Sequence, residues 1–196
     1  SEGDRAIQVV GALAWREPKQ ELGVYFAYRD LKKDNGDKTK ALAADLFARW
    51  HGKVSKRLAL RAAVEAVLIS GSTEQARFEG ADFPVDVRQF GCVFKGDLTH
   101  ASYNAGAGLE LGFASGDNSS QDSTIKNIKF DPGYKVGMIL FEEVLARISA
   151  RSHDRVRDPE LVGTPPKGSD LIPTNGSVTN AIYIFPQIFV RPNRGA

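Results

Sequence analysis

The sequence predicts an all-β fold: a segment of an antiparallel, up-and-down transmembrane β-barrel. Three observations carry this prediction. Apolar and polar residues alternate with period two along about seven segments, the connections between these segments alternate in length, and aromatic residues mark one common end of them. A single domain over 1–196 is expected, with about seven strands of a larger barrel and a long outer loop over 116–177.

Each predicted strand places its apolar side chains on one parity of the chain. In chain order, the positions on this apolar side are Ile7, Val9, Leu13 and Trp15; Leu22, Val24, Phe26 and Tyr28; Leu42, Ala44, Leu46, Ala48 and Trp50; Leu58, Leu60, Ala62, Val64, Ala66 and Leu68; Phe90, Cys92 and Phe94; and Tyr103, Ala105, Ala107, Leu109, Leu111 and Phe113. In a barrel this side contacts lipid, with Leu60, Val64, Leu109 and Leu111 near the middle of the membrane. The seventh segment, NAIYIFPQIFVR, has a blurred pattern that Pro186 interrupts.

The connections are short and long in turn, which is typical of an outer-membrane barrel with tight periplasmic turns and long outer loops. The expected periplasmic turns are 17–20, 52–56 and 97–101, and the expected outer connections are 32–40, 70–86 and 116–177. Trp15, Trp50 and Tyr103 have the lipid-facing parity and lie next to the short turns. They are therefore predicted to form an interfacial aromatic belt.

The sixth segment, NAGAGLELGFASGD, has a second face made almost entirely of Gly and Ala. Such a face is unusual for a solvated sheet, where Thr, Lys and Glu are common, and it fits a barrel lumen in which small residues make room for water or a solute. The alternative is a soluble, half-buried sheet such as a lipocalin-like barrel or a sandwich, because soluble strands also alternate.

The lumen-facing parity carries a set of charges that predicts what passes through the barrel. The predicted lumen residues are Arg16, Arg29, Asp45, Arg49, Arg61, Glu65, Lys95 and Glu110, with His51 as a titratable neighbour. Five cations against three anions give an excess of two, which favours anions in a narrow pore. Arg29, Arg49 and Arg61 are expected to contribute most, and the alternative is that the charges pair with one another and only keep the lumen wet.

The composition limits the other function classes. The chain of 196 residues is 42% hydrophobic and 26% charged with a net charge of +2, so it is long enough to fold, and bulk charge gives no reason to expect nucleic-acid binding. The single cysteine, Cys92, excludes an internal disulfide and a multi-cysteine metal site. No apolar run reaches the roughly 18 residues of a membrane helix.

Residues with the spacing of a known catalytic or cofactor motif are lacking, so no enzyme activity, catalytic residue, cofactor or metal is predicted. A weak calcium candidate is the loop with Asp117, Asn118 and Asp122, whose alternative interpretation is a solvated turn. FEEVLARISA has apolar residues at helical spacing and predicts one short loop helix near 139–150. That helix could pack on the barrel rim or form part of a constriction in the lumen.

GLELGFASGDNSSQD, followed by FDPGYKVGMILFEEVLA and TNGSVTNAIYIFP, resembles the later part of bacterial outer-membrane barrels of the alginate-export type. The match centres on FASGD, Phe113 to Asp117, and the strand layout extends it over most of the chain. The resemblance implies a monomeric barrel of about eighteen strands that passes an anionic polysaccharide through an Arg-lined lumen. Because seven is an odd number, the chain is expected to be an internal stretch of such a barrel.

The expected function is therefore that of a bacterial outer-membrane pore or exporter for a polar, anionic solute such as an acidic polysaccharide. Its partners would be membrane lipid, that solute and envelope proteins, with no nucleic acid. Two alternatives stay open. One is a structural or adhesive barrel that anchors a partner complex, and the other is a soluble all-β ligand-binding domain.

Overall fold

The computed structural model describes residues 3–74, 84–103, 105–117, 123–131, 133–137, 140 and 177–190. In this part of the chain one sheet contains all the strands, and its seven long strands are joined mainly as antiparallel neighbours. The strands are β1 (Arg5–Glu17), β2 (Gln20–Lys32), β3 (Lys38–Lys53), β4 (Leu58–Thr73), β5 (Val85–His100), β6 (Ala105–Ala114), β7 (Thr124–Ile125) and β8 (Ala181–Val190). The predicted all-β, up-and-down sheet is confirmed.

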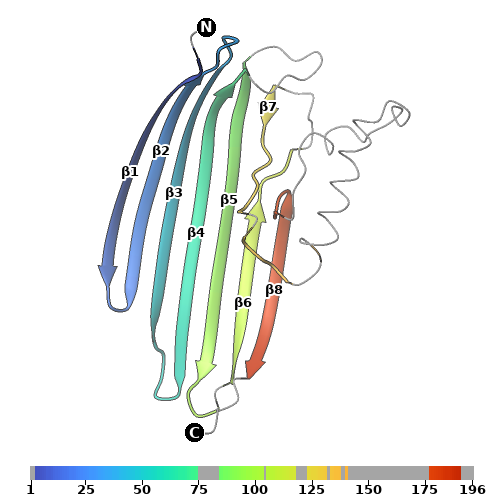
Figure 1. Cartoon of the computed structure of the whole chain (residues 1–196). Coiled ribbons are helices and arrows are strands. Elements are labelled where there is room, and N and C mark those ends of the chain that lie inside the picture. The colour runs from blue at the N-terminus through green and yellow to red at the C-terminus, as the bar shows by residue number, and fades with distance from the viewer. Residues whose placement is uncertain are drawn as a thin grey trace, which may run out of the picture.

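The strands lie in the order β1-β2-β3-β4-β5-β6-β8, so the long strands pair in chain order (Figure 1). The β1–β2, β3–β4 and β5–β6 turns all lie at one end of the sheet, and the strand ends that the long connections join lie at the other (Figure 1). Three strands run further than the sequence suggested. β3 reaches Lys53, β4 reaches Thr73 and β5 reaches His100, so residues 97–100 belong to a strand rather than to a turn.

The sheet is open at both sides. Since neighbouring long strands are antiparallel, the first and the seventh of them, β1 and β8, run in the same direction. They are not paired with each other, and in the described part of the chain each has one edge without a β-partner. No closed barrel is formed by these strands.

The sheet is also staggered. Along the line of paired residues that starts at Trp15, Trp50 lies two residues further along β3, and Tyr103 lies eight residues beyond the β6 residue on that line, Leu111. Adjacent strands lie near 4.8 Å apart, and each residue rises near 3.3 Å along a strand. With these spacings, the three aromatic residues would share one level if the strands were tilted by about 35–50° from a common axis. Figure 1 shows the same stagger, with the β1–β2 turn well above the other two turns.

One face of the sheet is apolar and exposed from β1 to β8. Cross-strand pairs such as Val64–Phe94 and Phe94–Leu111 put the predicted apolar parities on this one face. β8 continues it: Ile182 is 78% exposed and Ile188 is 90% exposed. Pro186 faces the same way opposite Leu109, and it is tolerated because β8 is an edge strand. We call this face the outer face.

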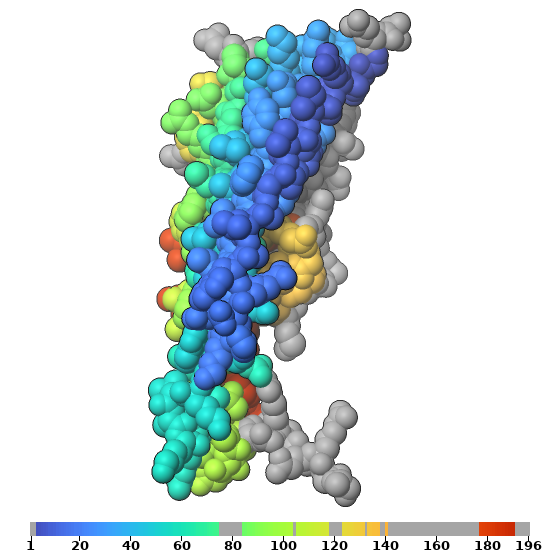
Figure 2. Space-filling view, turned by 90° about the vertical axis from the view of Figure 1, so that its left-hand side faces the viewer, coloured from blue at the N-terminus to red at the C-terminus, as the bar shows by residue number. Residues whose placement is uncertain are grey.

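The opposite, inner face is partly covered by a segment of the long β6–β8 connection, which belongs to the predicted outer loop over 116–177. Residues 123–137, the inner-face segment, begin with β7, which pairs in parallel with Asp86 and Val87 of β5. β6 ends opposite Gly91, so the upper part of the β5 edge is free for this pairing. Seen from the β1 edge, the segment (yellow) stands out from one side of the sheet (Figure 2).

The buried core is small and lies beneath this segment. Among the described residues, the fully covered apolar side chains are Val85, Ala114, Ile128, Val136 and Val178. Phe130 and Tyr134 of the segment pack around them, together with side chains of β4 and β8. No helix in the described residues has the length and apolar character needed to cross a membrane, and the helix expected near 139–150 lies outside these residues apart from Leu140.

Candidate functional site

The inner face carries a row of charges that crosses six strands. The row is formed by residues that lie opposite one another: Arg16, Glu21, Arg49, Ala63, Lys95 and Glu110. Glu21 bridges Arg16 and Arg49, with Nε–O distances of 2.6 and 2.7 Å. Lys95 pairs with Glu110 at 3.3 Å. The row thus consists of two groups of cross-strand ion pairs, one on each side of Ala63.

A second row lies next to the first, toward the short turns. His51, Arg61 and Asp97 face one another across β3, β4 and β5. Together with Arg49 and Lys95 they line a groove of about 460 Å³. The predicted lumen residues Arg49, Arg61 and Lys95 are therefore brought together at one end of the inner face, with Asp97 among them.

The remaining predicted lumen residues lie further toward the long loops. Asp45 of β3 and Glu65 of β4 line the same pocket, Asp45 two rows and Glu65 one row from the charge row. Arg29 lies on a separate row, opposite Gln8 and Ala41, well away from the other arginines. The structure therefore does not bring Arg29, Arg49 and Arg61 together as one group.

Two carboxylates missing from the predicted set change the charge balance. Glu21 has the inner parity of β2 but lies beside a turn, and Asp97 was assigned to a turn although β5 continues through it. Among the inner-parity residues of the strands, the cations are Arg16, Arg29, Arg49, Lys53, Arg61 and Lys95, and the anions are Glu21, Asp45, Glu65, Asp97 and Glu110. The expected cationic excess of two on the strands was therefore wrong, and the excess is one.

Glu110 is not an open lumen charge, because the inner-face segment covers it. The side chain of Glu110 is 8% exposed. The hydroxyls of Tyr134 and Tyr183 both donate to its Oε1 atom, the bond from Tyr183 being 2.9 Å long, and Lys95 Nζ lies 4.5 Å from the centre of the Tyr134 ring. Burial, followed by the bond to Glu110, raises the pKa of Tyr134. This cluster attaches the segment to β5, β6 and β8.

The Gly face of β6 is also covered rather than open to solute. Gly112 lies opposite Tyr183 and Gly106 lies opposite Phe189, and each aromatic ring lies against its glycine so closely that a Cβ there would overlap it. Gly91 of β5 accommodates Phe130 of the inner-face segment in the same way. At Gly106 and Gly112 the space expected to hold water is therefore filled by aromatic rings, whereas Gly108 lies nearest to Asp97 and Gln187.

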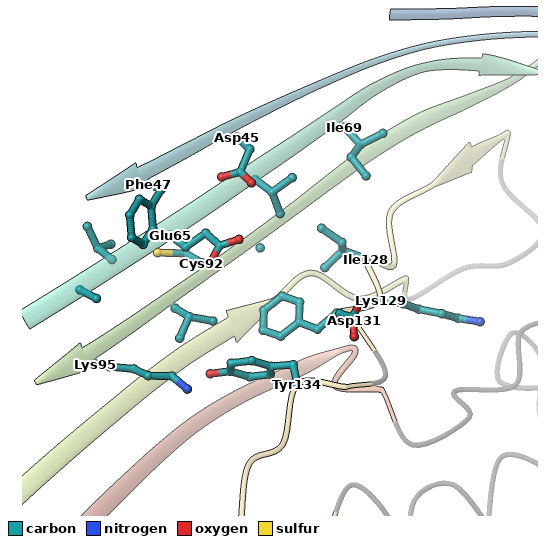
Figure 3. A pocket seen from close by; sticks show the side chains of 16 residues that line it. Asp45, Phe47, Glu65, Ile69, Cys92, Lys95, Ile128, Lys129, Asp131 and Tyr134 are labelled. Atoms are coloured by element: carbon teal, nitrogen blue, oxygen red, sulfur yellow. The ribbon is translucent and has the colours of Figure 1, made fainter. Parts of the chain in front are cut away.

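A pocket of about 520 Å³ lies between the strands and the inner-face segment. Asp45 and Glu65 approach it from β3 and β4, and Ile128, Lys129 and Tyr134 line its other side (Figure 3). The floor is apolar, with Phe47, Val67, Ile69 and Val93 among the lining residues. Burial lowers the pKa of Lys129, and the Lys129 side chain extends away from the strands (Figure 3).

The aromatic belt residues all lie on the exposed outer side or its turns: Trp15 is 51%, Trp50 38% and Tyr103 74% exposed. Asn118 and Asp122 of the calcium candidate lie outside the described residues, and the Asp117 carboxylate accepts the backbone N–H of Lys126. In the described part of the chain, no group of three acidic, His or Cys side chains is arranged to hold a metal.

Sequence reasoning missed Tyr134 and Tyr183 because neither stands out locally. Tyr134 follows a Pro-Gly turn in a long connection, and Tyr183 belongs to the strand with the blurred pattern. No family model, no curated protein and no solved structure matches this chain significantly.

Proposed function

We propose that this chain forms part of the wall of a bacterial outer-membrane β-barrel that acts as a passive pore or exporter for a polar, anionic solute. The observation that carries the proposal is the contrast between the two faces of one sheet. The outer face is apolar and exposed across all seven long strands, whereas the inner face carries the charge row. Large exposed apolar patches mark surfaces that are covered by a partner or a membrane.

The strand dimensions support a membrane in preference to a protein partner. The long strands contain 10–16 residues, and about 9–11 residues in a tilted strand cross the hydrocarbon layer. If the strands are tilted as in outer-membrane barrels, the register offsets of Trp50 and Tyr103 bring both of them near the level of Trp15. A protein partner would not require three aromatic residues on different strands to share a level.

Closure of such a barrel requires an odd number of additional strands. β1 and β8 run the same way, so only an odd number of antiparallel strands can connect their free edges. A second copy of this sheet placed head to tail would create parallel pairs at both junctions, which an antiparallel barrel lacks. Without closure, the edge N–H and C=O groups would lack partners in lipid.

The apolar pocket supports one rival, a soluble all-β domain that binds a ligand between β3–β5 and the inner-face segment. Its volume of about 520 Å³ is within the range of small-molecule sites. In that case water, not lipid, would cover the outer face. The two proposals therefore differ in what contacts the outer face, and a chemical probe can test this directly.

Cys92 provides that probe because it is the one cysteine of the chain and lies on the outer face, opposite Ala66 and Phe113. In lipid vesicles, Cys92 should be protected from a charged methanethiosulfonate, because the reagent does not enter the hydrocarbon layer and a thiol there stays protonated. The matched control is Cys92→Ala with Ala63→Cys on the inner face, which should react with this reagent. Equal reaction of both positions with the charged reagent would reject a membrane barrel.

Conductance then separates a pore from a structural barrel. Stepwise currents of the purified protein in planar lipid bilayers support the pore. A protein that passes the Cys92 test but gives no conductance would instead be an anchor for envelope partner proteins.

A further inference from the structure

We infer that the pocket between the strands and the inner-face segment binds an organic cation, with the cationic group at Asp45 and Glu65 and an apolar body on the floor of the pocket. This inference goes beyond the proposed pore, because it concerns a second ligand and holds whether lipid or water covers the outer face. Three features carry it: two carboxylates outside the ion pairs of the inner face, an apolar floor beside them, and a volume of small-molecule size.

The two carboxylates of the pocket are left out of the ion pairs that join the other strands. Glu21 and Glu110 each have a basic partner at 2.6 to 3.3 Å. In the described part of the chain, no ion pair includes Asp45 or Glu65. The Oδ1 atom of Asp45 is buried, and no described residue donates a hydrogen bond to it. A buried carboxylate oxygen without a donor is costly, so a ligand that donates to it is stabilised there.

The register places these two carboxylates close to each other. Asp45 lies opposite Val67, and Glu65 lies opposite Phe47, so the two acids are diagonal neighbours on β3 and β4. Diagonal neighbours on one face lie about 7–8 Å apart, and an ammonium group between them can contact both. Repulsion from Asp45 acts on Glu65 more strongly than attraction to Lys95 does. A cation between the two acids would therefore relieve their repulsion.

Three further charged residues line the pocket: Lys95, Lys129 and Asp131. Lys95 is bound to Glu110 at 3.3 Å, and its Nζ atom lies over the Tyr134 ring. The Lys129 side chain extends away from the strands (Figure 3), and the Asp131 carboxylate accepts a backbone N–H in its own turn. Two cations against three carboxylates give the lining a net charge of −1. This balance favours a cationic ligand over an anionic one.

The rest of the pocket is apolar and has the size of a small-molecule site. Phe47, Val67, Ile69 and Val93 form its floor, and Phe130 of the inner-face segment also lines it. A volume of about 520 Å³ is within the range of pockets that hold a drug-sized ligand. A hydrated metal ion would leave the apolar floor without a contact. The lining therefore favours an organic cation, whose apolar body covers the floor.

The test uses three probes that share one apolar body and differ in charge. On the same indole ring, tryptamine carries an ammonium group, tryptophol a hydroxyl group and indole-3-propionate a carboxylate. Each probe is titrated into the purified full chain by isothermal titration calorimetry, with the same solution without protein as the blank. Tryptamine should bind at least about tenfold more tightly than tryptophol, because only its ammonium group forms charge-assisted hydrogen bonds with the acids. Indole-3-propionate should bind more weakly than tryptophol.

Two isosteric variants assign the cation to its carboxylates. Asp45→Asn and Glu65→Gln should each weaken tryptamine binding by about tenfold, the effect of losing one hydrogen bond to a charged group. The double variant should bind tryptamine no more tightly than tryptophol. The matched control is Asp97→Asn, which removes an inner-face carboxylate from the neighbouring groove and should leave tryptamine binding unchanged. Tryptophol binding should persist in all these variants, which shows that the pocket is still formed.

Several results would overturn the inference. Equal binding of the three probes would mean that the pocket selects only for apolar groups, and binding of none would mean that it is no ligand site. Undiminished tryptamine binding by the double variant would place the cation elsewhere. Loss of tryptophol binding together with tryptamine binding would mean that the two acids maintain the pocket and do not hold a ligand.

Amine binding and conductance are independent measurements, so the inference and the proposed pore can fail separately. Tryptamine binding by a protein that does not conduct supports the inference and overturns the pore. Conductance by a protein that does not bind tryptamine overturns the inference and leaves the pore standing.

Discussion

The two halves of the sheet have the same outer face and different inner faces. In β1–β3, which we call the open half, nothing from the described part of the chain covers the inner face, and almost every residue of β1 is exposed. In β4–β8, which we call the covered half, the inner-face segment, Tyr183 and Phe189 lie over the strands, and all buried apolar residues are found there.

This difference teaches that the alternation of apolar and polar residues and the covering of the inner face have separate causes. Alternating residues make a strand with two faces in both halves. Whether the inner face is covered depends on where the long β6–β8 connection runs. This connection pairs through β7 with the part of the β5 edge that β6 leaves free. The halves should therefore respond alike to changes on the outer face and differently to changes on the inner face.

The largest effect is expected on the outer face, where both halves should behave alike. Val24→Arg in the open half and Leu111→Arg in the covered half should each lower the free energy of unfolding in lipid vesicles by about 2–4 kcal/mol, the cost of a cation near the bilayer midplane. Ala27→Arg, on the inner face of the open half, should cost much less. Urea titrations followed by tryptophan fluorescence measure these energies.

Equal costs for Val24→Arg and Ala27→Arg would mean that both faces of the open half are buried alike. A large cost for Leu111→Arg alone would mean that only the covered half contacts lipid.

A smaller effect is expected from one hydroxyl on the inner face, and here the halves should differ. Tyr134→Phe keeps the ring but removes the donor to the buried Glu110 carboxylate, so we expect a loss of about 1.5–3 kcal/mol, typical of a hydrogen bond to a charged group. Tyr25→Phe in the open half removes an exposed hydroxyl and should change stability by less than about 0.5 kcal/mol. The same urea titrations apply, and similar losses for both variants would remove the distinction between the halves.

Much of the fold could be predicted from the sequence because strands, turns and the outer face depend on local patterns. Trp15 and Leu111 were assigned to the outer face from their neighbours alone, and the register agrees. The contacts of Glu110 could not be predicted in this way. Tyr134 lies within the long β6–β8 connection and Tyr183 lies beyond it, and a two-residue period says nothing about where such a connection returns.

The charge balance was mispredicted for a different reason, the position of strand ends. Hydrophobic alternation weakens near a turn, where polar residues appear on both parities. Glu21 and Asp97 both lie within a few residues of a turn and were not counted, although the paired strands continue through them. Glu21, Asp97 and Lys53, all at strand ends, reduce the cationic excess from two to one.

The smallest effect, and the one that separates the halves by sign, comes from adding one methyl group to an inner-face glycine. At Gly112 the new Cβ would overlap the Tyr183 ring, whereas at Gly23 the nearest atom is 3.9 Å away. Gly112→Ala should therefore cost about 1–2 kcal/mol, as overpacking does, and it should also disturb the bonds of Tyr183 to Glu110. Gly23→Ala should be neutral or stabilise by up to about 1 kcal/mol, because alanine restricts the unfolded chain. Urea titration gives the sign of each change. Destabilisation by Gly23→Ala to the same extent would show that the open half is covered after all, by a part of the barrel that closes over β2.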